Sequence, residues 1–551
     1  MKGIKMVVPI VFVVVLLAPT ALSLCPPPGP IFPPPALDSN AFDFSIPDAL
    51  FSNLTYLEET SFAIQAAIGN TTVFQYEHSA PGRQLNQSLF ETKIRIASAT
   101  KLITALAIEL SKDKISLDDP VTKFIPGLNE ELYGDVTVKA LADHTSGLGR
   151  FGYTGDLAYS QGAASLGLPK INNTLPRCDP VPGGRICTTQ EVLAEFNNPT
   201  YAPYSPNARA LYSNIGYILL GRILEAVHNQ TYEDVIQKLI LGPVGMKKST
   251  FISPSKDDAT AILPRRPEDK SWFVDDFGNL NPTGGLWSTP NEMMLLLHAL
   301  QNNDLLSAVA LRDWMKPTTF LSSVNQAVGI AWEIFRITDL PLEFPRAIDI
   351  YTKLGGVPGY GSYFVLIPEF DIAITINAAG GAGGATSFVC IDLLGKITAA
   401  LIPYADQLAR KQAASKYAGT YKLATSETND TITISSTYGP GLSIDSMTIN
   451  NVAVLPALAA SQGTPVENFS ARLYPTDPDS LGTDKENWRM LLDQKVPAQK
   501  LFGDMECMSW NLGDPLRYVS EPLDTFVFHM DGKKVASVEL LGWRVSLVKV
   551  N

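Results

Sequence analysis

The chain has 551 residues, of which 45% are hydrophobic and 18% charged, and its formal net charge at pH 7 is -12. This amount of apolar material supports a large core and excludes a globally disordered chain. The sequence contains no concentrated basic stretch, which argues against a nucleic-acid partner and against binding to an anionic membrane surface. The length predicts two to four domains.

The N-terminus has the pattern of a secretory signal peptide, which we place at residues 1–23. Lys2 and Lys5 precede an apolar stretch, and small residues near position 23 offer a cleavage site. We therefore expect a secreted, extracellular protein that makes no membrane contact once the signal is removed. A Pro-rich leader at 24–40 follows, and we expect it to be extended and exposed.

Two further features fit an exported protein. Sequons of the Asn-x-Ser/Thr type predict glycosylation, at Asn53, Asn70, Asn86, Asn172, Asn229, Asn429 and Asn468. Cys178 and Cys187 bracket a turn-rich segment, for which a local disulfide is the first choice. One pairing of the other cysteines joins Cys390 to Cys507 and leaves Cys25 free. No group of Cys or His has metal-site spacing, so we expect no metal and no cofactor.

Residues 41–405 predict an α+β domain. Segments 61–68 and 72–76 flank a Gly-Asn turn and predict a hairpin. Apolar spacing predicts a buried helix after residue 98. Further helices are expected at 215–227, 232–241, 291–300 and 387–401. Further strands are expected at 328–332, 351–354, 362–367 and 372–377. This order favours an antiparallel sheet flanked by helices, with a helical insertion.

Residues 413–551 differ in character from the rest of the chain. Their segments alternate in polarity or favour β-branched residues, without a strong helical period. Such segments occur at 417–421, 431–435, 442–449, 526–530 and 537–548. They predict a C-terminal all-β domain, either a sandwich or a small barrel.

The first chemical motif is a Ser-x-x-Lys pair at the head of the buried helix. Ser98 and Lys101 stand three residues apart and would share a helix face. A serine hydroxyl becomes a nucleophile only when a base takes its proton. Burial and a helix N-terminus both disfavour the charge of a lysine, so Lys101 could be that base. Alone, the pattern is explained better by a serine helix cap followed by a solvated lysine.

Two later segments supply partners for this pair. A phenol beside two lysines, such as Tyr212, would favour its phenolate and could act as a base or proton relay. The amide of Asn214 can orient a substrate. Lys353 begins a strand edge that ends in glycines, and the Gly356 amide could join the Ser98 amide in an oxyanion hole.

The order Ser-x-x-Lys, Tyr-x-Asn, Lys-x-Gly resembles the serine β-lactamase and penicillin-binding-protein superfamily, nearest its class C and esterase-like branch. The framing segments 144–148 and 284–289 also resemble recurring segments of that family. The likeness covers roughly residues 50–403. The chain is also similar to secreted fungal β-lactamase-like proteins that carry an additional C-terminal β domain.

The resemblance implies a β-lactamase/transpeptidase-like fold and a role for each motif residue. Ser98 would be the acylated nucleophile, Lys101 its activating partner and Tyr212 a proton relay to the leaving group. Residues that would bind the substrate or the oxyanion are Asn214, Lys353, Gly355 and Gly356. Leu354 departs from the family, because members that act on β-lactams usually have a hydroxyl residue there that helps bind the substrate carboxylate.

We therefore predict a secreted serine hydrolase that forms an acyl-enzyme on Ser98. Its substrate would be a small-molecule or peptide-like ester or amide, as in esterases, amidases and D-peptidases. One alternative is acyl transfer on the same residues in small-molecule biosynthesis. The other is a β-lactamase-like binding protein without turnover. The sequence implies no oligomeric state.

Overall fold

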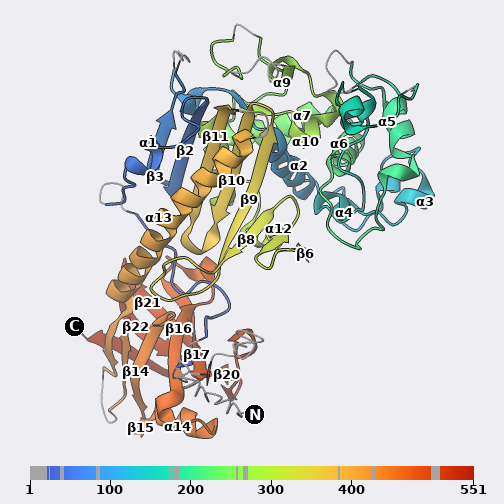
Figure 1. Cartoon of the computed structure of the whole chain (residues 1–551). Coiled ribbons are helices and arrows are strands. Elements are labelled where there is room, and N and C mark those ends of the chain that lie inside the picture. Colours follow the sequence, from blue (N-terminus) through green and yellow to red (C-terminus); the bar gives the residue numbers. More distant parts are fainter. Residues whose placement is uncertain are drawn as a thin grey trace, which may run out of the picture. The chain divides into compact units, whose positions relative to one another are not determined.

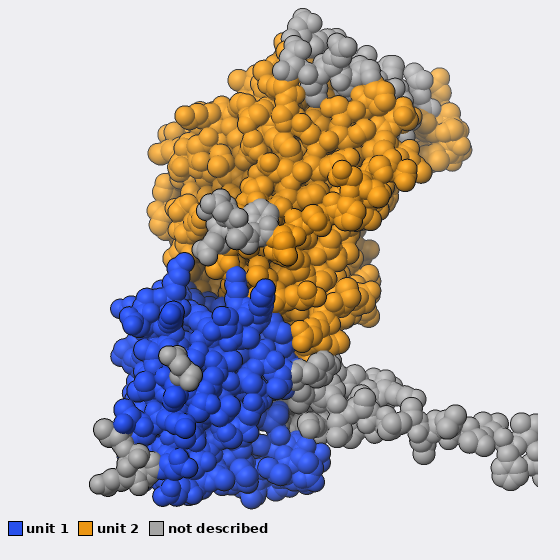
Figure 2. Space-filling view, turned by 90° about the vertical axis from the view of Figure 1, so that its left-hand side faces the viewer, with its two compact units in different colours: residues 1–33, 409–551 blue, residues 34–408 orange. Residues whose placement is uncertain are grey.

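The structure is a computed structural model of the chain. It describes residues 22–23, 25–37, 43–81, 87–159, 161–172, 175–178, 185–255, 258–264, 271–381, 385–424, 429–437, 439–494, 496–497 and 509–550. The chain divides into two compact units, which Figure 2 shows in different colours. The larger unit is Pro34–Leu408, and the smaller unit combines Met1–Pro33 with Ala409–Asn551.

An antiparallel sheet of eight strands forms the centre of the larger unit (Figure 1). Its strand order is β3-β2-β11-β10-β9-β8-β7-β6. The strands are β2 (Thr60–Ile68), β3 (Thr71–His78), β6 (Thr319–Phe320), β7 (Gln326–Val328), β8 (Glu333–Ile337), β9 (Ile348–Val357), β10 (Tyr360–Ile367) and β11 (Ile372–Gly380). A short pair, β4 (Ile94–Arg95) and β5 (Trp287–Ser288), lies outside this sheet. The predicted hairpins β2–β3 and β10–β11 are confirmed.

The strand predicted at 328–332 is wrong. Residues 329–332 form the turn between β7 and β8, where the Gly329 amide donates to the Trp332 carbonyl at 2.9 Å. Ala331 has a φ of 65°, a left-handed conformation that cannot continue a strand. The strand after this turn therefore begins at Glu333, as β8, and not at residue 328.

Helices cover both faces of the sheet. The helices of the larger unit are α1 (Ala49–Ser52), α2 (Thr100–Glu109), α3 (Glu130–Tyr133), α4 (Val138–Ala142), α5 (Thr189–Phe196), α6 (Asn214–His228), α7 (Tyr232–Ile236), α8 (Gly242–Val244), α9 (Ser271–Val274), α10 (Asn281–Gly284), α11 (Pro290–Gln301) and α12 (Ala308–Trp314). On one face of the sheet, α2 and α6 pack together in one hydrophobic core. On the other face, α13 (Ala385–Tyr417) packs against the sheet in a second core. Since both faces are covered, every residue of β2 is buried.

The helix α13 extends well beyond the predicted 387–401 and lies across one face of the sheet (Figure 1). By length and composition, its segment Thr386–Tyr417 could cross a membrane. Leu393, Ile397 and Leu401 on this helix are fully buried in the core between α13 and the sheet. Packing within the unit therefore accounts for much of its apolar character.

The smaller unit is a closed β-barrel. Its nine-stranded sheet has the order β13-β12-β23-β22-β21-β17-β16-β14-β15, and a further pairing of β13 with β14 closes it. Its strands are β12 (Gly419–Lys422), β13 (Thr431–Ser435), β14 (Leu442–Ile449), β15 (Val452–Ala453), β16 (Phe469–Pro475), β17 (Lys485–Gln494), β21 (Thr525–Asp531), β22 (Lys534–Leu540) and β23 (Val545–Val550). Shorter pairs are β1 (Leu22–Ser23) with β18 (Val496–Pro497), and β19 (Arg517–Tyr518) with β20 (Glu521–Pro522). The helix α14 (Val454–Ser461) was not predicted.

The Pro-rich leader is only partly exposed: residues 28–30 are exposed as expected, but other residues are buried. Ile31 and Phe32 are 1% and 2% exposed and belong to the core of the smaller unit. The prediction failed because proline content indicates an extended backbone and does not reveal whether the apolar residues between prolines find a partner surface. Residues 1–21, with most of the predicted signal peptide, lie outside the described residues.

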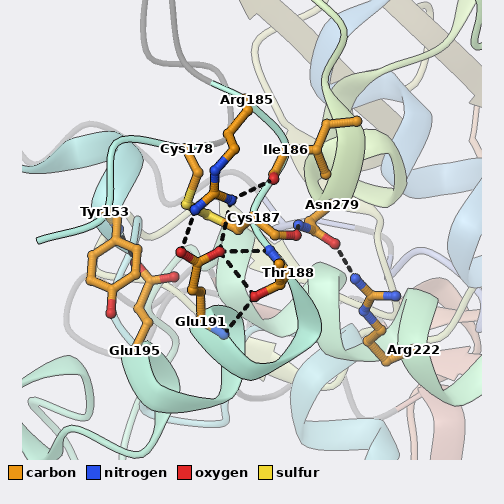
Figure 3. The surroundings of a disulfide bond; sticks show 10 residues. All are labelled: Tyr153, Cys178, Arg185, Ile186, Cys187, Thr188, Glu191, Glu195, Arg222 and Asn279. Atoms are coloured by element: carbon orange, nitrogen blue, oxygen red, sulfur yellow. Dashed lines mark hydrogen bonds and ion pairs between the residues drawn. A yellow bond between two sulfur atoms is a disulfide. The ribbon is translucent and has the colours of Figure 1, made fainter.

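The predicted disulfide between Cys178 and Cys187 is present (Figure 3). The pairing of Cys390 with Cys507 is wrong, because Cys390 is a free, fully buried thiol and Cys25 is disulfide-bonded. Cys390 lies on the buried face of α13, where its Sγ would be 2.9 Å from a Cβ built on Gly361 of β10. Cys507 lies outside the described residues.

Glycosylation stays a prediction. Among the sequons, Asn86 lies outside the described residues and Asn468 is half-buried. The exposed sequon residues are Asn53, Asn70, Asn172, Asn229 and Asn429.

Candidate active site

Ser98 lies in a single 3-10 turn, Ala97–Ala99, between β4 and the start of α2. The turn is tied to the central sheet, since the Ser362 hydroxyl on β10 donates to the Ile96 carbonyl at 2.6 Å. Ala97 has a φ of 49°, which is uncommon for a residue with a side chain. Strained backbone of this kind clusters at functional sites, and here it immediately precedes the predicted nucleophile.

Lys101 is fully buried in the first turn of α2. Its Nζ lies 3.2 Å from the Ser98 Oγ and donates to the Asn214 Oδ1 at 2.7 Å. It also donates to the Thr283 carbonyl of α10 at 2.7 Å. Burial lowers the pKa of Lys101 to about 8, although the nearby Tyr212 opposes that shift. An amine with this pKa is available in its neutral form near physiological pH and can accept the Ser98 proton.

Tyr212 and Asn214 are positioned by the start of α6. Ser213 caps this helix, because its Oγ accepts from the Gly216 amide at 3.0 Å and donates to the Gly149 carbonyl at 2.9 Å. Tyr212 and Asn214, which flank Ser213 in the sequence, both lie next to Lys101. Asn214 accepts the bond from Lys101, and the ring centroid of Tyr212 lies 5.1 Å from the Lys101 Nζ.

The electrostatic surroundings of Tyr212 favour its phenolate. The Nζ of Lys353 lies 5.3 Å from the ring centroid. Burial raises the pKa of Tyr212, but the charges of Lys101 and Lys353, with a hydrogen bond from Ser98, lower it to a net value below 10. Tyr212 is therefore suited to exchange a proton with Ser98 or with a leaving group.

Lys353 lies on β9, with 1% of its surface exposed. Its Nζ lies 2.5 Å from the Glu333 Oε1, and the other carboxylate oxygen of Glu333 accepts from the Leu354 amide at 3.0 Å. Burial lowers the pKa of Lys353, but Glu333 and Tyr212 raise it to a net value above the usual one. Lys353 is thus a permanent cation held by one carboxylate, whereas Lys101 is the lysine that can lose its proton.

The edge of β9 beyond Thr352 is open towards β8. The pairing of these strands ends at Glu333 with Thr352. Amides of alternate residues in a strand point to the same side. The Leu354 amide points to the β8 side, where it meets Glu333, so the Gly356 amide also points to this open edge. This is the donor that the predicted oxyanion hole requires.

Gly355 allows β9 to approach the Ser98 turn closely. A Cβ built on Gly355 would lie 1.9 Å from the Ile96 carbonyl oxygen and 2.8 Å from the Ala99 nitrogen. Any side chain at this position would therefore push the turn away from the strand. Gly355 thus contributes space for the contact between strand and turn.

The structure adds Glu333, Thr283 and His144 to the residues selected from the sequence. The His144 carbonyl accepts from the Leu211 amide at 2.8 Å, and its Nδ1 accepts from the Ser213 amide at 3.2 Å. Its ring centroid lies 4.5 Å from that of Tyr212. Burial, with the charges of Lys353, Lys101 and Arg150, lowers the pKa of His144 well below 6.5 and keeps the ring neutral.

Of these three added residues, the sequence pointed only to His144. His144 belongs to a segment that framed the motifs. Glu333 was hidden by the misplaced strand at 328–332, and Thr283 acts through its carbonyl, which no residue pattern reveals. Within the described ranges, no group of three or more His, Cys, Asp or Glu residues is placed to hold a metal ion.

The motif residues come together from five separate segments of the larger unit. These are the Ser98 turn with α2, the start of α6, α10, the first residue of β8 and the glycine end of β9. The described sequon residues do not belong to these segments. The arrangement provides a nucleophile, two groups able to take its proton, an amide that orients and an open backbone donor.

Two family models match the chain. Residues 61–395 match the Beta-lactamase family model, and residues 409–551 match a model described as a beta-lactamase-like C-terminal domain. A probable hydrolase from Phoma sp. is 28% identical over 560 residues, covering 95% of this chain and 91% of the relative. A beta-lactamase-like protein from Arthroderma benhamiae is 26% identical over 539 residues, covering 90% and 88%.

The solved structures to which the chain is similar include a penicillin-binding protein homologue from Pyrococcus abyssi. It is 19% identical with a TM-score of 0.48, over 91% of this chain and 98% of that chain. The D-amino acid amidase of Ochrobactrum anthropi is 22% identical with a TM-score of 0.48, over 63% and 94%. Because the Beta-lactamase model matches more than half of the 551 residues, the chain belongs to the Beta-lactamase family, within a group of beta-lactamase-like hydrolases.

Proposed function

We propose that the chain is a serine hydrolase that forms an acyl-enzyme on Ser98 and cleaves an ester or an amide. The observation that carries this proposal is the fully buried Lys101, whose Nζ lies 3.2 Å from the Ser98 Oγ and whose pKa is lowered to about 8.

The geometry supports the following sequence of steps. Lys101 or Tyr212 takes the Ser98 proton, and the Oγ attacks the substrate carbonyl carbon to form a tetrahedral intermediate. The amides of Ser98 and Gly356 stabilise its oxyanion. Tyr212 then donates a proton to the leaving group as the bond to it breaks, which leaves the acyl group on Ser98. A water molecule, deprotonated by the same groups, releases the acid and restores Ser98.

The substrate class that we propose is an ester or amide other than a standard penicillin, as in esterases, amidases and D-peptidases. Leu354 places an apolar side chain at the edge of β9, and its backbone amide is already bonded to Glu333. The strand edge therefore offers no side-chain hydroxyl at this position to a β-lactam carboxylate.

We also propose that the protein is secreted and glycosylated. This proposal rests on the signal-like N-terminus and on five exposed sequon residues. Expression in a eukaryotic host should deliver the protein to the medium, with a mass that falls after treatment with an N-glycosidase. Retention in the cell at the unmodified mass would contradict it.

A fluorophosphonate probe tests the acyl-enzyme directly. The folded protein should be labelled on Ser98, and the labelled peptide can be identified by mass spectrometry. The Ser98→Ala variant should lose both labelling and turnover while keeping its circular dichroism spectrum. Ser116→Ala, which removes an exposed hydroxyl in the loop after α2, is the matched control and should label normally. Absence of label on Ser98 in the folded protein would overturn the proposal and favour a binding protein.

A further inference from the structure

Three cationic side chains surround the ring of Tyr212, and two of them are already paired. Lys101 donates to Asn214 and to the Thr283 carbonyl, and Lys353 is bonded to Glu333. The third cation is Arg150, which is exposed. To the described part of the chain, its guanidinium makes no hydrogen bond and no ion pair.

The backbone holds Arg150 firmly at the second motif. Its carbonyl accepts from the Asn214 amide at 3.0 Å, and the preceding Gly149 amide donates to the Tyr201 carbonyl at 2.7 Å. Its Cζ lies 5.1 Å from the ring centroid of Tyr212 and 5.5 Å from that of Phe151. Contacts with aromatic rings position a guanidinium but satisfy none of its five N–H donors, which remain free for a planar anion.

The position relative to Tyr212 indicates which part of the substrate Arg150 would meet. In the proposed mechanism, Tyr212 protonates the leaving group, so the leaving group binds beside Tyr212. Arg150 is the cation beside the same ring that has no partner among the described residues. The edge of β9 presents the apolar side chain of Leu354, which cannot bind a carboxylate. The charge of Lys353 is already compensated by Glu333. A carboxylate on the substrate would therefore find its unpaired, bidentate partner at Arg150.

We propose that Arg150 is a specificity-determining residue that binds a carboxylate on the leaving group of the ester or amide substrate. This inference rests on the function proposed above and specifies its substrate class. The competing explanation is that Arg150 only supports the phenolate of Tyr212 through its charge. That effect would act on every substrate equally.

Paired substrates separate the two explanations. Two esters share one acyl group, and their leaving groups are 3-hydroxybenzoate and the uncharged 3-hydroxybenzamide. In Arg150→Gln we expect kcat/KM for the carboxylate ester to fall on the order of 10- to 100-fold, mainly through KM, as for loss of a hydrogen bond to a charged group. The amide-bearing ester should change less than about twofold, and Arg150→Lys should show a partial loss because lysine cannot bind bidentately.

Arg209→Gln is the matched control for the change in net charge. Arg209 is also exposed, its Cζ lies 4.7 Å from the ring centroid of Tyr204, and it makes no hydrogen bond or ion pair to the described residues. Its removal should leave the preference for the carboxylate ester unchanged. An equal change in Arg150→Gln and Arg209→Gln would show that only general charge matters and would overturn the proposal.

A second measurement requires no turnover of either ester. The rate at which the fluorophosphonate labels Ser98 is measured with 3-hydroxybenzoate or 3-hydroxybenzamide present. Wild-type protein should be protected better by the carboxylate, and Arg150→Gln should lose this difference. Equal protection in the wild type, or equal losses for both esters, would overturn the role of Arg150 while Ser98 still labels. Failure of Ser98 to label at all would instead overturn the proposed function.

Discussion

The Lys353 Nζ lies 2.5 Å from the Glu333 Oε1, and the same carboxylate accepts the Leu354 amide at 3.0 Å. One acidic side chain therefore fixes both a buried cation and the backbone of the third motif. The charge of Lys353 is partly neutralised before any substrate binds. Since Glu333 also raises the pKa of Tyr212, its carboxylate opposes the effect of the two lysines on the phenol.

Glu333→Gln should lower activity and shift its pH dependence. The amide can still accept from Leu354, but the charged bond to Lys353 is lost, which should reduce kcat/KM on the order of 10-fold. Removal of the negative charge lowers the pKa of Tyr212 further, so any limb of the pH profile that reports Tyr212 should move to lower pH. The measurement is kcat/KM against pH for both proteins. A shift to higher pH would contradict this placement of Glu333.

Tyr212→Phe should reduce kcat by about 10²-fold or more, as expected for a general acid–base residue. The ring contacts with His144 and Arg150 can persist, so the fold should survive. Tyr217→Phe, in the helix that follows Tyr212, is the matched control, because its hydroxyl donates to the Ala142 carbonyl at 2.7 Å in the protein core. We expect Tyr217→Phe to cost about 1 kcal/mol of unfolding free energy and little rate. Near-wild-type turnover in Tyr212→Phe would exclude its role as proton relay.

Activity should rise with pH between about 7 and 9. Burial lowers the pKa of Lys101 to about 8, so its neutral, proton-accepting form increases as the pH rises through that value. The lowered pKa of Tyr212 acts in the same direction, because its phenolate also forms at a lower pH than in a free tyrosine. The rate of fluorophosphonate labelling of Ser98 across this range is the measurement. A labelling rate that falls as the pH rises would mean that neither group is the base.

Gly355→Ala should disturb the site from the backbone. A methyl group there would lie 1.9 Å from the Ile96 carbonyl oxygen and 2.6 Å from the Ser362 hydroxyl. We expect a loss of about 1–3 kcal/mol of unfolding free energy and slower labelling of Ser98. Gly395→Ala in α13 is the control, since nothing lies within 4 Å of its added Cβ. That change should be neutral or stabilise the helix by up to about 1 kcal/mol. Equal effects of the two changes on labelling would contradict the role assigned to Gly355.

Local patterns were enough to predict much of the fold. The hairpin β2–β3, the hairpin β10–β11 and the β character of the C-terminal region follow from short-range alternation and turn residues. The turn at 329–332 was missed because β-branched and aromatic residues also occur where the backbone reverses. The barrel also requires β12 to pair with β23 from the end of the chain, and no local pattern specifies that pairing. The free state of Cys390 depends in the same way on its place against β10.

By itself, the sequence determined the order and chemistry of the three motifs, because residue types and short spacings are written in it directly. Tertiary structure decided what those residues become. It buries Lys101 so that its pKa falls to about 8, and it pairs Lys353 with Glu333. It leaves Arg150 as an exposed cation beside Tyr212, without a hydrogen bond or ion pair to any described residue. Desolvation and charge pairing depend on groups far apart in the chain, and only folding brings those groups into contact.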